Sequence, residues 1–166
     1  NGQIYTFGDG ENGRLGHGNI SNQLKPKMIE GFENIKSVSC GKYHTAFINE
    51  NGEVYTFGNG RYGRLGHGNE KSQSDPKMIE GFKNIKSISC GNSHTTFINK
   101  NGEVYTFGNG EEGQLGHGNN SNQLEPIMIQ GFIIVLVKTY LEKISKFYWT
   151  KIAIMNLNCF LTFSGF

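Results

Sequence analysis

Histidine is the residue type in this chain best suited to metal binding or proton transfer, and its five copies recur in two sequence contexts. His17, His67 and His117 stand in Leu-Gly-His-Gly, whereas His44 and His94 stand in Gly-x-x-His-Thr. A zinc site needs four ligands that converge on one point, but side chains repeated at a constant interval are spread along the molecule. We therefore predict no metal site and no catalytic histidine, and we expect the imidazoles to form hydrogen bonds between repeated structural units.

Cys40 and Cys90 also share one repeated position, between an apolar segment and a glycine. We expect both to be small, buried side chains near the narrow end of a repeated unit. No charged-then-apolar leader stands at the N-terminus. A cytoplasmic or nuclear location is therefore expected, and with it reduced thiols.

A Gly-x-Gly-x-x-Gly motif, formed by Gly8, Gly10 and Gly13, directly follows a predicted strand. In a dinucleotide-binding fold this motif opens a helix whose N-terminus holds the pyrophosphate. The residues that follow here, Arg-Leu-Gly-His-Gly-Asn, are too rich in glycine for a helix, and the motif recurs twice more along the chain. We therefore expect a turn, and no nucleotide or other cofactor.

The composition points to short strands and tight turns. Glycine accounts for 24 of the 166 residues, about twice its usual ~7%. The formal net charge of +2 gives no strong argument for binding nucleic acid or a membrane surface.

An internal repeat with a period of 50 residues organises the chain. The sequence NGQIYTFGDG begins at Asn1, and NGEVYTFGNG begins at Asn51 and again at Asn101. Segments 1–50 and 51–100 are identical at 34 of 50 positions. A period of this length indicates a solenoid, propeller or array, in which one unit cannot bury its apolar face alone.

Each unit is predicted to contain four short strands joined by turns. In 1–132 no segment shows a helical period, and four antiparallel strands per repeat are typical of a propeller blade. An Asn-Gly pair between two alternating segments predicts a hairpin with a type I′ turn. The predicted strands are Gln3–Phe7, Lys27–Glu30 after a proline, Ile35–Ser39 and Thr45–Asn49, and the hairpin is at Asn51-Gly52.

These motifs resemble the regulator-of-chromosome-condensation repeat. The features of that family stand at Phe57-Gly58, at Leu65 to Gly68 and at Cys90 to Thr95, and the likeness extends over 1–132. The resemblance implies an all-β propeller ring of seven blades, about 350 residues, so we expect this chain to be a fragment, a truncated product or part of an assembly. The alternative fold is a kelch propeller, but 1–132 contain neither a Gly-Gly pair nor tryptophan.

The predicted domain organisation is one propeller segment followed by a divergent tail. Segment 1–132 comprises the repeats 1–50 and 51–100 and the partial repeat 101–132, which together give about two complete blades plus edge strands. In 133–166 the repeat pattern ends, and apolar residues from Val137 to Ile152 follow a spacing of three and four. That spacing predicts an amphipathic helix. The alternative, which we favour, is that this tail is an artefact of the gene model.

The resemblance implies a non-catalytic scaffold for protein–protein interaction. The alternative is part of a guanine-nucleotide exchange factor for a small Ras-like GTPase, although no inserted loop of the kind used for exchange is visible. We expect another protein as partner, and no nucleic acid, membrane or small-molecule substrate. Loops on a rigid scaffold commonly carry recognition, so the candidate contact residues are the loop positions that differ between repeats: Glu11, Asn12, Lys42, Tyr43, Arg61, Tyr62, Glu111 and Glu112.

Overall fold

The alternating segments of each unit form short strands in the computed structural model, which describes residues 2–133. Ten strands lie in this part of the chain. In the first unit β1 covers Tyr5–Gly8, β2 Gln23–Met28, β3 Ile35–Cys40 and β4 His44–Asn49. In the rest of the chain β5 covers Val54–Gly58, β6 Gln73–Met78, β7 Ile85–Cys90, β8 His94–Asn99, β9 Glu103–Gly108 and β10 Gln123–Ile133.

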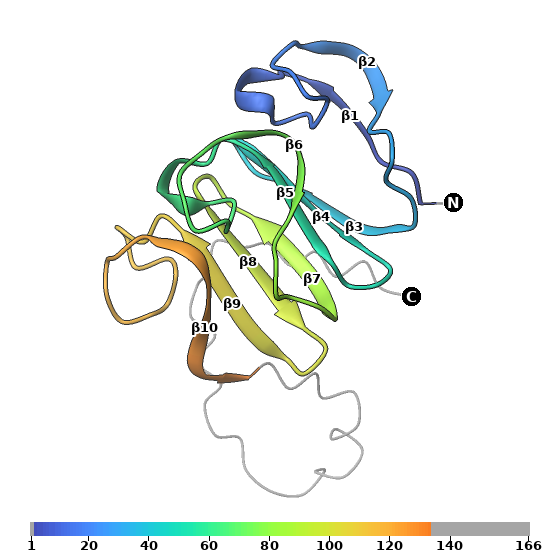
Figure 1. Ribbon diagram of the computed structural model, residues 1–166. Helices are drawn as coiled ribbons and strands as arrows, with labels where there is room; N and C mark the ends of the chain where they lie inside the picture. Colours follow the sequence, from blue (N-terminus) through green and yellow to red (C-terminus); the bar gives the residue numbers. More distant parts are fainter. Residues whose placement is uncertain (1, 134–166) are drawn as a thin grey trace, which may run out of the picture.

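The strands form two four-stranded antiparallel blades and one smaller sheet (Figure 1). Blade 1 contains β3 to β6 and blade 2 contains β7 to β10, so each blade joins the second half of one unit to the first half of the next. The two complete blades that the sequence predicted are confirmed. A lone strand was expected at each end, but β1 pairs with β2 in an N-terminal sheet, and β10, the last strand in the described residues, belongs to blade 2.

The hydrophobic cores lie between neighbouring sheets rather than within one sheet. Phe47 and Phe57 of blade 1 pack against Ile4 and Ile29, which adjoin β1 and β2 of the N-terminal sheet. A second cluster joins the two blades. Each fully buried side chain of this kind contributes about 1.5–3 kcal/mol of transfer free energy, so the stability of a unit depends on its neighbours. The cluster between the blades contains Ile48, Val54, Ile79, Ile85, Phe97 and Phe107.

The turns differ in detail from the sequence-based expectation. Short 3-10 helices occur at Glu11–Gly13 (η1) and Arg61–Gly63 (η2), in a region predicted to contain no helix. The hairpin at Asn51-Gly52 is present, but only Gly52 has a positive φ, 76°. The Gly52 N–H donates to the Asn49 carbonyl at 2.9 Å. This is a three-residue loop ending in a left-handed glycine, not the predicted type I′ turn.

Two further expectations need correction. Pro26 was expected just before its strand, but it lies inside β2, which among residues 2–133 pairs with β1 alone. An outer strand tolerates proline because its free edge needs no N–H donor. Cys40 was expected to be buried and is exposed, whereas the equivalent Cys90 is half-buried. The difference arises because β3 packs against β7 and covers Cys90, whereas within residues 2–133 the N-terminal sheet contains β1 and β2 alone and has no inner strand to cover Cys40.

The predicted tail, 133–166, falls outside the described residues except for Ile133, the last residue of β10. Among residues 2–133 there is no helix with the length and apolar character needed to cross a bilayer.

Candidate binding site on the turn face

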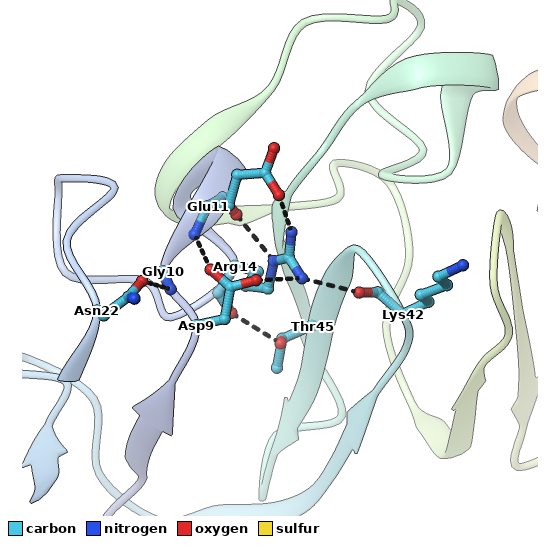
Figure 2. Close-up of polar contacts among 7 residues, drawn as sticks. All are labelled: Asp9, Gly10, Glu11, Arg14, Asn22, Lys42 and Thr45. Atoms are coloured by element: carbon cyan, nitrogen blue, oxygen red, sulfur yellow. Dashed lines mark hydrogen bonds and ion pairs between the residues drawn. The ribbon is translucent and has the colours of Figure 1, made fainter. Parts of the chain in front are cut away.

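The glycine-rich turn of the first unit is held by Arg14. The Arg14 Nε–H donates to the Glu11 carbonyl at 2.9 Å, and Nη1 donates to the Lys42 carbonyl at 3.2 Å (Figure 2). The same guanidinium forms ion pairs with Asp9, at 3.1 Å, and with the Glu11 carboxylate, at 2.9 Å. The positive charge of Arg14 is therefore neutralised within its own turn.

Arg64 holds the second turn in the same way but without those ion pairs. Its Nε–H donates to the Arg61 carbonyl at 2.9 Å, and Nη1 donates to the Asn92 carbonyl at 3.2 Å. Asn59 and Arg61 stand where Asp9 and Glu11 stand in the first turn, and among residues 2–133 no carboxylate lies within ion-pair distance of Arg64. Burial lowers the pKa of Arg64, but a guanidinium stays protonated at neutral pH.

Aromatic rings occupy the space between these guanidinium groups. The Tyr43 ring centroid lies 5.7 Å from Arg14 Cζ and 5.2 Å from Arg64 Cζ. The Tyr62 ring centroid lies 5.6 Å from Arg64 Cζ and 4.5 Å from Arg61 Cζ. Cations within about 6 Å of an aromatic face are attracted to its quadrupole. Cations and rings thus alternate in a series that we call the Arg–Tyr ladder: Arg14, Tyr43, Arg64, Tyr62 and Arg61.

Tyr62 adopts a backbone conformation that is uncommon for a bulky residue. Its φ is 63°, in the left-handed region, and the equivalent Asn12 has a φ of 60°. Asparagine is enriched in this region, whereas an aromatic residue there is strained. The surrounding contacts with Arg61 and Arg64 keep the ring in place despite that strain.

The ladder borders an open depression of about 410 Å³. Five of the residues predicted from sequence variation line it, from two turns and from the loop before β4. Lys42 lies beside the depression, with Nζ 5.0 Å from the Tyr43 ring centroid. The last two predicted residues, Glu111 and Glu112, belong to the third turn and do not line it. The lining residues are Glu11, Asn12, Tyr43, Asn59, Arg61, Tyr62, Arg64 and Ser93.

Sequence reasoning missed the two arginines at the centre of this arrangement. Arg14 and Arg64 are identical in the first two units, so they were treated as scaffold. A signal was nevertheless present, because the equivalent position in the third unit is Gln114. Gln114 carries no charge, and its side chain donates to the Asn109 carboxamide oxygen.

The histidines of the Leu-Gly-His-Gly segments form hydrogen bonds within their own sheets. Thr56 Oγ1 donates its only proton to the Leu65 carbonyl at 2.7 Å, so His67 Nε2, 3.0 Å away, must be the donor to Thr56. The bond lies within one blade, not between blades as predicted, and the same pattern recurs at His17 and His117. Burial is the main cause that lowers the pKa of His67 to about 4.

His44 forms the hydrogen bond between blades that the sequence predicted. Its Nε2 lies 2.7 Å from Thr95 Oγ1, which donates to the Arg64 carbonyl at 2.8 Å. Burial, followed by the charge of Arg64, lowers the pKa of His44 to about 3. The imidazole is therefore neutral at pH 7 and links β4 of blade 1 to Thr95 of blade 2, whose hydroxyl in turn binds the turn that carries Arg64. No cluster of three or more metal-binding side chains occurs among residues 2–133.

Comparison with known sequences decides the family. A model described as the regulator of chromosome condensation (RCC1) repeat matches residues 1–48, 51–98 and 101–138. This chain belongs to the RCC1 repeat family. A second model of the RCC1 repeat matches residues 35–64 and 85–114, which join the second half of one unit to the next, as the blades do.

Individual RCC1-repeat relatives match about one repeat of this chain. The inhibitor of Bruton tyrosine kinase from Homo sapiens is 42% identical over 52 residues, which are 30% of this chain and 4% of that protein. The serine/threonine-protein kinase Nek8 of Danio rerio is 49% identical over 53 residues, 30% of this chain and 8% of the kinase. The chain thus spans only a small part of these relatives.

Two solved structures share the fold. Prp20p from Saccharomyces cerevisiae aligns with a TM-score of 0.71 at 21% identity, over 77% of this chain and 34% of Prp20p. Human WBSCR16 aligns with a TM-score of 0.66 at 24% identity, over 75% of this chain and 34% of that protein. At these identities the likeness establishes the propeller fold alone.

Proposed function

We propose that this RCC1-repeat chain is a non-catalytic protein-binding module whose contact surface is the Arg–Tyr ladder. This proposal rests on the second turn. There Arg61 and Arg64 stack on tyrosine rings beside an open depression, and neither forms an ion pair with a carboxylate of residues 2–133. Arginine and tyrosine are common anchors of protein interfaces. The strained backbone of Tyr62 also supports a functional role, because such strain concentrates at binding and active sites.

The charge of the turns indicates the chemistry of the partner. The first turn carries Asp9, Glu11 and Arg14, a formal charge of −1, and the second carries Arg61 and Arg64, a charge of +2. The third carries Glu111 and Glu112, a charge of −2. Only the second turn is positive, and guanidinium groups bind carboxylates in a planar, bidentate geometry. We therefore expect an acidic segment of the partner to bind over Arg61 and Tyr62.

Relatives with this fold support a protein as the partner class. The work on Prp20p describes its binding to Gsp1p and histones, and a second structure shows it bound to Kap60. The alternative function, exchange on a small Ras-like GTPase, has no residue of the described structure in its favour. Release of labelled nucleotide from such a GTPase, measured with and without this chain, separates the two functions.

Photo-crosslinking in cells tests the proposal directly. We would place a benzoylphenylalanine at position 62, where it keeps an aromatic ring, and at position 100 as the control. Lys100 is exposed on the hairpin between β8 and β9, at the end of the blade away from the turns. Adducts with another protein are expected at position 62 and not at 100, and Arg61→Glu should remove them. Equal labelling at both positions would overturn the proposal.

A peptide selection tests the predicted chemistry of the partner. Random peptides displayed against the full chain should be enriched in aspartate and glutamate, and the enrichment should disappear with Arg61→Glu. Lys100→Glu provides a matched change from positive to negative charge on an exposed residue at the other end of the blade and should leave the selected sequences unchanged. Enrichment in basic or neutral peptides would contradict this part of the proposal.

A further inference from the structure

Arg64 is a buried cation at the edge of the open depression on the turn face. Its exposed fraction is only 2%, although it is one of the residues that line the depression. Two of its five guanidinium N–H groups donate to the carbonyls of Arg61 and Asn92, and the other three have no acceptor among residues 2–133. Buried charges are normally paired with an opposite charge, because their removal from water is costly. The charge of Arg64 therefore calls for an anion.

The first turn shows which groups satisfy such an arginine. Arg14 donates to two backbone carbonyls, as Arg64 does. Its Nη1 also pairs with Asp9 Oδ2 at 3.1 Å, and its Nη2 pairs with Glu11 Oε2 at 2.9 Å (Figure 2). In the second turn an asparagine and a further arginine stand at the two acidic positions. The second turn thus lacks the two negative charges that the first turn provides for its own arginine.

A second cation lies beside Arg64. The Cζ atoms of Arg61 and Arg64 lie 4.5 and 5.6 Å from the centroid of the same Tyr62 ring. Burial is the main cause that lowers the pKa of Arg64, and the charge of Arg61 acts in the same direction, whereas Glu70 raises this pKa from beyond ion-pair distance. Two positive charges therefore lie close together at one depression.

Ser93 provides space and a hydroxyl group beside Arg64. It occupies the loop position of Tyr43, whose ring centroid lies 5.7 Å from Arg14 Cζ in the first unit. Ser93 and Arg64 both line the depression, so a small hydroxyl side chain stands where the first unit has a ring. Glu11 is the one acidic residue of the lining, and its carboxylate is already paired with Arg14. The depression thus offers two guanidinium groups and a hydroxyl donor to an anion.

We propose that this depression binds a phosphorylated side chain of the partner, with the phosphate against Arg64, Arg61 and the Ser93 hydroxyl. A phosphate monoester carries a charge of about −1.5 to −2 at neutral pH and three acceptor oxygens. One such group therefore supplies the charge that Asp9 and Glu11 supply together in the first turn, whereas one carboxylate supplies half of it. Guanidinium groups also bind phosphate through two parallel N–H bonds. This inference rests on the proposed function, because it specifies the acidic group that binds at the same turn.

The charges around the depression favour an isolated phosphate over a polyanion. The first and third turns carry formal charges of −1 and −2, and the second carries +2. A continuous run of phosphates, as in a nucleic acid, would extend from the positive turn towards negative ones and be repelled. A single phosphorylated residue in a protein segment binds at the positive turn alone.

An oriented peptide library tests the phosphate. Peptides with a central phosphoserine and random flanks are selected on the full chain, and the strongest binder is titrated beside its glutamate and serine counterparts at about 0.15 M salt. We expect the phosphoserine peptide to bind about tenfold more tightly than the glutamate peptide, and an oligonucleotide of equal length not to compete.

The outcomes separate this inference from the proposed function. Equal affinity for phosphoserine and glutamate overturns the inference and leaves the acidic partner in place. Competition by the oligonucleotide overturns it in favour of a general polyanion site. If no peptide binds, the inference also fails, and crosslinking at position 62 decides the proposed function independently.

Two variants test whether the phosphate lies beside Arg64. Arg64→Gln gives the second turn the residue of the third, where Gln114 donates to the Asn109 side chain, and it should reduce the preference for phosphoserine over glutamate about tenfold. Lys100→Gln removes a positive charge at the other end of the blade and should leave the preference unchanged.

The second variant, Ser93→Tyr, gives its loop the residue of the first unit. It should weaken binding of the phosphoserine peptide about tenfold, because the ring fills the space beside Arg64. Urea midpoints establish that each variant is folded. A phosphoserine preference that persists in both folded variants would overturn the assignment of the phosphate to this depression.

Discussion

The first and second units carry the same residue at 34 of 50 positions, yet the structure gives equivalent side chains different surroundings. Phe7 is exposed and Phe57 is buried; Arg14 pairs with two carboxylates, whereas Arg64 packs between two tyrosines. The neighbouring sheet, more than the sequence of the unit itself, determines the role of each side chain. A residue that faces the preceding sheet is buried in the second unit and exposed in the first.

The largest difference in the free energy of unfolding should come from substitutions of the two equivalent phenylalanines, Phe7 and Phe57. Phe57→Ala should lower the free energy of unfolding by about 3–5 kcal/mol, because it removes a ring buried between Phe47, Ile4 and Ile29 and leaves a cavity. Phe7→Ala should change it by only about 0.5 kcal/mol, as expected for an exposed site. Urea unfolding of the two variants measures this difference. Similar losses for both would show that the N-terminal sheet is covered in solution.

Substitutions of the two arginines should differ less in their effect on the free energy of unfolding. Arg64→Ala should cost about 3 kcal/mol, because it removes a residue that is 2% exposed together with the charged donor for the carbonyls of Arg61 and Asn92. Arg14→Ala should cost about 1 kcal/mol, since ion pairs in a partly exposed turn contribute little. The same urea titration compares them, and an Arg14→Ala loss as large as that of Arg64→Ala would contradict the difference in environment.

The strands were predictable from the sequence because alternation is a local property. Segment 35–39 alternates cleanly and forms β3, and the hairpin at Asn51-Gly52 is where the sequence placed it. The Arg–Tyr ladder was not predictable in the same way. Arg14 and Tyr43 are far apart in sequence, and they meet only because the N-terminal sheet stacks on blade 1. For the same reason the burial of Cys90 and the exposure of Cys40 depend on a neighbour that a single unit does not encode.

In acid, the histidine of the first unit should matter more for stability than that of the second, because His44 lies against the following blade. Its pKa in the folded chain is about 3, against about 6.5 when unfolded. The unfolded chain therefore takes up a proton first, and stability is lost as the pH falls from about 6.5 towards 3, by about 2 kcal/mol between pH 6.5 and pH 5.

Variants of the two equivalent histidines check this pH dependence. His44→Gln should flatten the fall in unfolding free energy between pH 7 and pH 5. His94→Gln should flatten it less, because the pKa of His94 is also lowered by burial but no further blade covers this residue in the described structure. An unchanged pH dependence in His44→Gln would contradict the assignment of His44 as a neutral link between blades.

The last change gives the second turn the residues of the first. Of the changes described, it should have the smallest effect on stability and the largest effect on binding. The changes are Asn59→Asp, Arg61→Glu and Tyr62→Asn. Asn59 Oδ1 and Asp9 Oδ1 each accept the same backbone hydrogen bond, at 2.9 Å, from Arg61 N and Glu11 N. Asparagine also suits the left-handed position of Tyr62. The urea midpoint should therefore stay the same or rise slightly.

Titration of this exchanged chain with the protein captured at position 62 tests the central claim most directly. The account predicts that affinity falls at least tenfold, about 1.4 kcal/mol, while the folded structure and the urea midpoint are retained. An affinity equal to that of the wild type, with the three changes in place, would contradict the assignment of the second turn as the binding surface.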